Sequence, residues 1–174
     1  IRNVNQVVVK QEKSGYQIVE AYKSLRTNLQ FCGEDKKVIA VTSCTPNEGK
    51  SSVSMQLGIS LAESGKRVIL IDADLRKSVL LGRTKTQKSV RGLAHFLSGQ
   101  ATLEDVICST NVKNFYMIYS GPFPPNPAEL LGGKNFRSLL NALRKVYDYV
   151  IVDTPPLGSV IDSAIVAEIC DGSI

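Results

Sequence analysis

Three stretches of this 174-residue chain are apolar without alternation, and each ends in small or polar residues. They read VIAVTS (38–43), RVILIDAD (67–74) and YVIVDTPP (149–156). Continuous apolar runs of this length are typical of parallel strands that are buried on both faces. Helical patterns separate the runs, so the order of elements predicts an α/β domain with a mostly parallel sheet flanked by helices. In such sheets the functional loops follow the carboxyl ends of the strands.

The rest of the pattern predicts a single domain over residues 1–174. An amphipathic helical segment covers about 14–32, a helix covers 50–64, and helical patterns recur over 126–147 and 162–169. NFYMIYSG (114–121) is typical of a fourth strand. The chain stops at CDGSI, where Ser173 and Ile174 begin a further strand. We therefore expect the C-terminal part of the domain to be missing.

Composition narrows the class of protein. The sequence has no run of about 18 apolar residues and no signal-peptide pattern. Its four cysteines have no metal-type spacing, which indicates reduced thiols and a cytoplasmic location. A formal net charge of +5 suits an anionic partner, but no nucleic-acid-binding signature accompanies it.

The stretch SCTPNEGKSS (43–52) lies between the first apolar run and a helix. It ends as phosphate-binding loops do, although Cys44 stands where their pattern begins with glycine. Gly49 lets the backbone approach phosphate oxygens, Lys50 reaches the β- and γ-phosphates, and Ser51 can ligate Mg²⁺. The alternative is a chance helix start. We predict a P-loop NTPase-type domain that binds ATP and Mg²⁺ through Asn47, Glu48, Gly49, Lys50, Ser51 and Ser52.

Carboxylates end the other two runs. Asp153 occupies the place of the second Mg²⁺-binding carboxylate of P-loop proteins, the alternative being a helix cap. Asp72 and Asp74 are two residues apart, so both can face one side of the strand end. We predict metal binding by Ser51, Asp72 and Asp153, and catalytic roles for Lys50, Asp72 and Asp74, with Asp72 as base. The alternative is a structural pair of an aspartate with Arg76.

Together, SCTPNEGKSS, VILIDADLR and YVIVDTPP resemble the Walker A, A′ and B motifs of the bacterial tyrosine kinases of capsule and exopolysaccharide synthesis. EAYKSLRTNLQF resembles that family's N-terminal assembly helix, which implies that Glu20, Lys23 and Arg26 mediate oligomerisation. Lys23 stands where the family has arginine, which keeps the charge but loses the planar guanidinium. Cys44 and Asn47 also depart from the family's loop.

The resemblance implies an ATP-dependent protein-tyrosine kinase that assembles as a ring and phosphorylates the tyrosine tail of a neighbouring subunit. It also implies a membrane adaptor of the polysaccharide co-polymerase type, which recruits the kinase to the inner face of the plasma membrane. The family's C-terminal tyrosine cluster does not occur in this sequence. One alternative is an ATPase switch of the partitioning type, disfavoured because Thr45 stands where those proteins have a signature lysine. The other is a nucleotide-dependent assembly module without turnover.

A basic segment follows the A′ motif. Between Leu75 and Gly92 there is no acidic residue, and six basic residues occur. They are Arg76, Lys77, Arg83, Lys85, Lys88 and Arg91. The segment is either solvated surface or a docking strip for an acidic partner segment.

Overall fold

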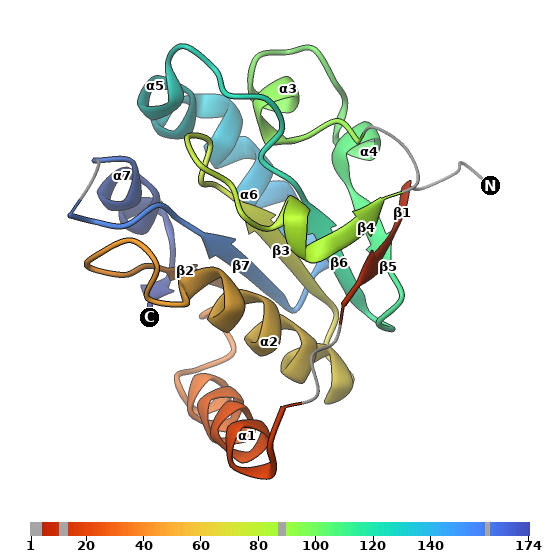
Figure 1. Cartoon of the computed structure of the whole chain (residues 1–174). Coiled ribbons are helices and arrows are strands. Elements are labelled where there is room, and N and C mark those ends of the chain that lie inside the picture. The colour runs from red at the N-terminus through yellow and green to blue at the C-terminus, as the bar shows by residue number, and fades with distance from the viewer. Residues whose placement is uncertain (1–4, 11–13, 87–89, 159–160) are drawn as a thin grey trace.

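The computed structural model describes residues 5–10, 14–86, 90–158 and 161–174. One mixed sheet of eight strands, in the order β4-β1-β5-β6-β3-β7-β2-β8, forms its centre. Figure 1 shows the sheet between two helical layers. The strands are β1 (Asn5–Val9), β2 (Val38–Val41), β3 (Val68–Asp72), β4 (Thr84–Thr86), β5 (Cys108–Thr110), β6 (Phe115–Ile118), β7 (Tyr149–Asp153) and β8 (Gly172–Ser173).

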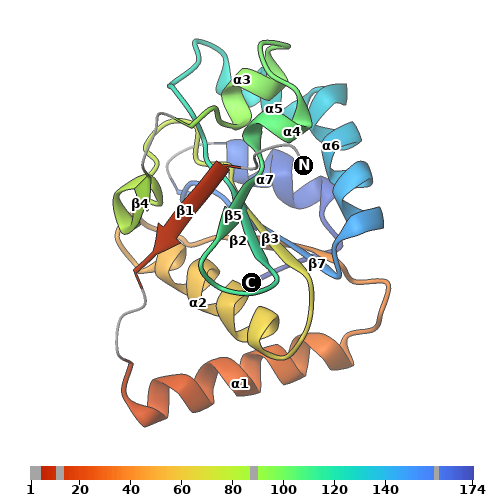
Figure 2. The ribbon, with the colours of Figure 1, turned by 90° about the vertical axis from the view of Figure 1, so that its right-hand side faces the viewer.

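The helices cover both faces of the sheet. They are α1 (Tyr16–Phe31), α2 (Lys50–Glu63), the 3₁₀ turn η1 (Leu81–Arg83), α3 (Leu93–Leu97), α4 (Leu103–Val106), α5 (Pro127–Gly132), α6 (Lys134–Val146) and α7 (Asp162–Ile169). α2 packs on one face, and α1 lies along its outer side (Figure 2). The remaining α-helices cover the other face. No helix in the described ranges is both long and apolar enough to cross a membrane.

The strands β6, β3, β7, β2 and β8 run parallel to one another. Every residue of β2, β3 and β7 is buried, as the continuous apolar runs predict. β8 pairs with Ile39 and Ala40 of β2, so the strand expected at the end of the sequence is present. The predicted mostly parallel α/β architecture is confirmed.

The other side of the sheet was not predicted. β5 runs antiparallel to β6, β1 pairs parallel with β5, and β4 closes this edge antiparallel to β1. β4 and β5 have only three residues each, which is too short for a periodic pattern to appear. Their place depends on strand pairing between distant parts of the chain.

Candidate active site

The phosphate loop joins β2 to α2. Gly49 precedes the helix with φ of +83°, in the left-handed region that glycine adopts without strain. Asn47 also has a positive φ, +65°, which asparagine tolerates better than most residues. The Glu48 carboxylate accepts a hydrogen bond from the Thr45 amide at 3.2 Å. The loop therefore reverses tightly, and the first turn of α2 begins at Lys50, where unpaired helix amides favour an anion.

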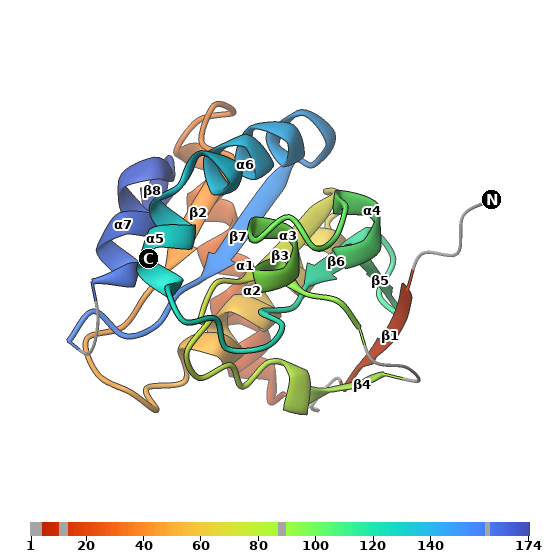
Figure 3. The same ribbon diagram turned by 90° about the horizontal axis from the view of Figure 1, so that it is seen from above.

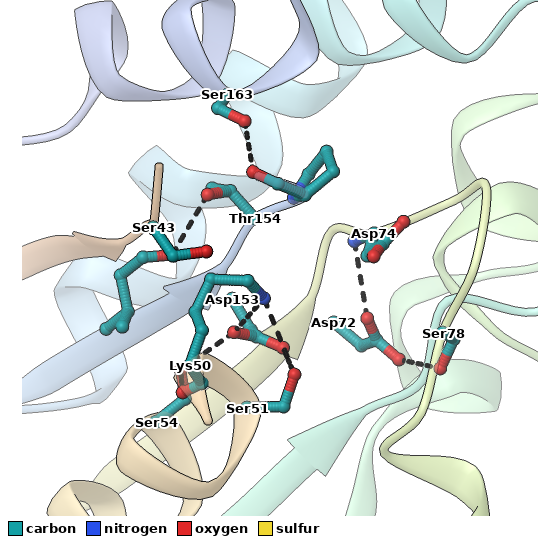
Figure 4. Close-up of polar contacts among 12 residues, drawn as sticks. Ser43, Lys50, Ser51, Ser54, Asp72, Asp74, Ser78, Asp153, Thr154 and Ser163 are labelled. Carbon is teal, nitrogen blue, oxygen red and sulfur yellow. Dashed lines mark hydrogen bonds and ion pairs between the residues drawn. The ribbon is translucent and has the colours of Figure 1, made fainter. Parts of the chain in front are cut away.

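Asp153, at the end of β7, gathers three side chains from the first turns of α2 (Figure 4). Lys50 Nζ lies 2.8 Å from Oδ1, the Ser51 hydroxyl donates to Oδ2 at 2.7 Å, and the Ser54 hydroxyl donates to Oδ1 at 2.8 Å. The side chains of Lys50 and Asp153 are only 8% and 1% exposed. Lys50 thus has an acidic partner that a reading of the loop alone does not reveal.

Asp72 lies beside Asp153, because the two residues are register partners on the neighbouring strands β3 and β7. It is 1% exposed. Burial, with smaller contributions from the nearby Asp153 and Asp74 carboxylates, raises the pKa of Asp72 to about 7. The Ser78 hydroxyl hydrogen bonds to Oδ2, and the Asp74 amide donates to Oδ1 at 3.3 Å. A carboxyl group that titrates near neutrality suits proton transfer.

Asp74 has a different environment. Its carboxylate accepts hydrogen bonds from the backbone amides of Arg76 at 3.3 Å and Lys77 at 2.9 Å. These two bonds close the turn after β3. Arg76 pairs with Asp162 at the start of α7, Nε to Oδ2 at 2.8 Å and Nη2 to Oδ1 at 3.2 Å. Asp162 is fully buried, so this two-bond contact ties the A′ turn to α7.

A cleft of about 380 Å³ lies above these residues. Its walls are the phosphate loop, the turn after β3 and the segment after β7. Four cationic side chains line it: Lys50, Arg76, Lys77 and Arg83. Arg83 also hydrogen bonds to the Ser52 hydroxyl on α2. The cleft therefore joins helix amides and positive charge, which suits a polyphosphate.

The donor set also fits Mg²⁺. Ser51 and Asp153 are hydrogen bonded to each other, and Asp72 stands on the next strand. No cluster of three or more metal-ligating side chains occurs in the described part of the chain. Mg²⁺ does not need one, because it is commonly held by one or two carboxylates together with phosphate oxygens and water.

Comparisons with known proteins agree with this geometry. A family model described as "AAA domain" matches residues 36–169. The tyrosine-protein kinase CpsD of Streptococcus agalactiae serotype III is 46% identical over 155 residues, covering 89% of this chain and 67% of that protein. The tyrosine-protein kinase YwqD of Bacillus subtilis is 40% identical over 157 residues, covering 89% and 66%. The kinase domain of the Escherichia coli tyrosine kinase ETK superposes with a TM-score of 0.85 at 32% identity, covering 96% of this chain and 75% of that one.

This chain belongs to the bacterial tyrosine-kinase family. The predicted P-loop fold and family are confirmed. The residues predicted to bind nucleotide and metal or to act in catalysis lie together at the carboxyl edge of the sheet. Among them, the Ser52 hydroxyl is hydrogen bonded to Arg83, and the Glu48 carboxylate is hydrogen bonded to a backbone amide of the loop itself.

The N-terminal helix of the kinase differs from expectation. Lys23 and Glu20 form an exposed ion pair of 2.8 Å, but Arg26 is turned inward and donates to the Ser60 carbonyl at 2.9 Å. Arg26 is thus partly buried and has a partner within the domain, and the assembly role of the three side chains stays a prediction. On the apolar side of α1, Leu29 is buried and Tyr22 and Leu25 pack against the core, whereas Ile18 is 51% exposed.

Sequence reasoning missed four residues of the site: Ser54, Ser78, Arg83 and Asp162. Ser54 stands four residues after Lys50, so helical spacing alone could have placed it on the same side of α2. Nothing local marks the other three, because their partners belong to other elements. Of the basic segment, Lys88 lies outside the described residues.

Proposed function

We propose that this protein transfers the γ-phosphoryl group of Mg·ATP to a tyrosine hydroxyl. The observation that carries the proposal is Asp72, a buried carboxyl group with a pKa of about 7 beside a cationic cleft at the carboxyl edge of the sheet. At neutral pH a large fraction of this group can accept a proton, which an ordinary aspartate does poorly. The relatives named tyrosine-protein kinases support the choice of acceptor.

When bound, Mg·ATP supplies the phosphoryl group: the bond from the γ-phosphorus to the β,γ-bridging oxygen breaks as the bond to the tyrosine oxygen forms, and ADP leaves. In this proposal Lys50 exchanges part of its contact with Asp153 for the β- and γ-phosphates. Ser51, Asp153 and Asp72 are the candidate Mg²⁺ ligands, Asp72 accepts the hydroxyl proton, and Asp74 holds the A′ turn that carries them. Asn47, Glu48, Gly49 and Ser52 shape the loop around the phosphates.

The test is incubation with Mg·ATP followed by an anti-phosphotyrosine blot, with released inorganic phosphate measured in parallel. Asp72→Asn keeps the shape but cannot act as base, so we expect phosphotransfer to fall about 10² to 10⁴-fold. Asp35→Asn, which changes an exposed carboxylate, is the matched control. Phosphate release without phosphotyrosine would support the ATPase switch instead. Equal loss of ATP affinity and turnover in Asp72→Asn would indicate a purely metal-binding role.

We also propose that the kinase assembles as a ring in which the tyrosine tail of one subunit reaches the cleft of the next. An apolar strip lies on α1 next to the Glu20–Lys23 pair. It consists of Tyr16, Ile18 and Val19, each of which is 40% or more exposed. A mixed apolar and charged strip suits a polar, reversible contact between unlike surfaces. Replacing Glu20 and Lys23 by alanine should reduce the oligomer seen by light scattering, with ATP binding retained. An unchanged oligomer would contradict this role.

A membrane adaptor of the polysaccharide co-polymerase type is proposed as the activating partner, with the kinase held at the inner face of the plasma membrane and acting in capsule or exopolysaccharide synthesis. Family membership supports this proposal. The measurement is the amount of tagged kinase that co-purifies with a membrane fraction. We expect the kinase to be lost from that fraction when the candidate adaptor gene is deleted. Equal membrane recovery without the adaptor would reject it.

A further inference from the structure

A second cavity lies beside the phosphate cleft, on the side of β3 that faces β6. It has a volume of about 540 Å³ and is lined by residues 75–78 and Leu81 after β3, by Val90, and by residues 119–123 after β6. Figure 3 shows these two segments along one edge of the sheet. Arg76 and Lys77 line both cavities, so the two share a wall. The volume falls in the range of small-ligand sites.

Ser78 links this cavity to Asp72. The serine lines the cavity, and its hydroxyl hydrogen bonds to Oδ2 of Asp72 (Figure 4). The other carboxylate oxygen is taken by the Asp74 amide. Asp72 itself is 1% exposed and lines neither the phosphate cleft nor the second cavity, so Ser78 separates its carboxylate from the second cavity. A hydroxyl group in the second cavity can reach Oδ2 by displacing the Ser78 hydroxyl, and Asp72 then keeps the same number of hydrogen bonds.

The lining of the cavity favours an aromatic ring with acidic neighbours. Leu81 and Phe123 line it and are 53% and 62% exposed, so both present apolar surface that a ligand can cover. Among the described residues that line the cavity there are two cations and no carboxylate. Arg76 is already paired with Asp162, so Lys77 carries the positive charge that a ligand can use. An aromatic side chain gains by contact with such apolar and cationic groups.

We propose that this cavity is the acceptor groove, which receives the tyrosine of an acidic peptide segment. The ring lies against Leu81 and Phe123, the hydroxyl replaces Ser78 as donor to Asp72, and an acidic residue beside the tyrosine pairs with Lys77. The inference rests on the proposed function, which it deepens by assigning the acceptor's binding surface and charge. Leu81 and Phe123 line this cavity and not the phosphate cleft, whereas Lys77 lines both.

The test is the binding of a fluorescently labelled Glu-Glu-Tyr-Glu-Glu peptide, followed by anisotropy with Mg²⁺ and a non-hydrolysable ATP analogue. Phe123→Ala should weaken binding at least tenfold, and so should replacement of the peptide's tyrosine by alanine. Val146→Ala is the matched control, since Val146 is similarly exposed (53%) but lies at the end of α6 and lines neither cavity. Leu81→Ser provides a second variant should Phe123→Ala fold poorly by circular dichroism. Nucleotide affinity should be unchanged in all of these variants.

Three results would overturn the acceptor groove: no peptide binding by the wild type at about 1 mM, wild-type affinity in both groove variants, or equal affinity for the tyrosine and alanine peptides. The proposed function is tested separately, by measuring phosphotyrosine on the peptide after incubation of the wild type with Mg·ATP. Binding that depends on Phe123 without any transfer would retain the groove and reject the kinase activity. Transfer with an unchanged peptide KM in Phe123→Ala would retain the kinase activity and reject the groove.

Discussion

Asp72 should make the stability of the ligand-free protein fall as the pH rises. Burial raises its pKa from 3.8 to about 7 in the folded protein, whereas the unfolded chain keeps the ordinary value. Between these two values the folded state binds a proton that the unfolded state has lost. The free energy of unfolding therefore decreases as the pH rises from about 4 through 7.

The magnitude follows from the size of the shift. One pKa unit is worth about 1.4 kcal/mol, so the full effect well above pH 7 is roughly 4 kcal/mol. Part of this is already lost at pH 5, which leaves about 3 kcal/mol between pH 5 and pH 8. Asp72→Asn is neutral at every pH and lacks this contribution. The difference in unfolding free energy between the wild type and Asp72→Asn should therefore change by about 3 kcal/mol over this range, in favour of the variant at high pH.

The assay is urea unfolding at pH 5, 6, 7 and 8 without Mg²⁺, followed by far-UV circular dichroism because the chain has no tryptophan. Asp35→Asn is the control. Its exposed carboxylate is paired with Lys36, whose hydrogen bond holds the pKa of Asp35 below its usual range, so its contribution stays constant above pH 5. A wild-type minus Asp72→Asn difference that varies by less than about 1 kcal/mol would refute the assignment of Asp72 as a buried, easily protonated group.

Three further perturbations test other contacts. Lys50→Met should lower phosphotransfer by roughly 10² to 10³-fold, which kinetics measure. It should also lower the unfolding free energy by about 3 kcal/mol, measured by urea unfolding at pH 7, because Asp153 is left buried without its lysine. Arg26→Ala should cost about 1.5 kcal/mol through the lost hydrogen bond to a backbone carbonyl, whereas Lys23→Ala, an exposed site, should change stability by less than about 0.5 kcal/mol; equal effects would contradict the inward orientation of Arg26. Gly92→Ala should lower the unfolding free energy by roughly 1 to 3 kcal/mol, since its Cβ would lie 2.3 Å from the backbone nitrogen of Gly121. A melting temperature equal to that of the wild type would show that the segments around Gly92 and Gly121 separate at little cost.

The sequence alone determined those features that depend on local patterns. Continuous apolar runs identified β2, β3 and β7, and helical spacing located α2. The Gly-Lys-Ser ending identified the phosphate loop, because a tight reversal into a helix needs a residue such as Gly49 with positive φ. The carboxyl ends of parallel strands meet at one edge, so Asp72 and Asp153 could be expected to lie together.

The tertiary structure decided the contacts that join distant elements. The Lys50–Asp153 pair forms across 103 residues because β7 lies between β3 and β2. The pairing of Arg76 with Asp162, 86 residues away, and the inward turn of Arg26 depend on how helices pack against the sheet and each other. Local sequence sets backbone geometry and the face on which a side chain stands. It does not specify which distant group meets that side chain, since the identity of the partner depends on strand order and helix packing along the whole chain.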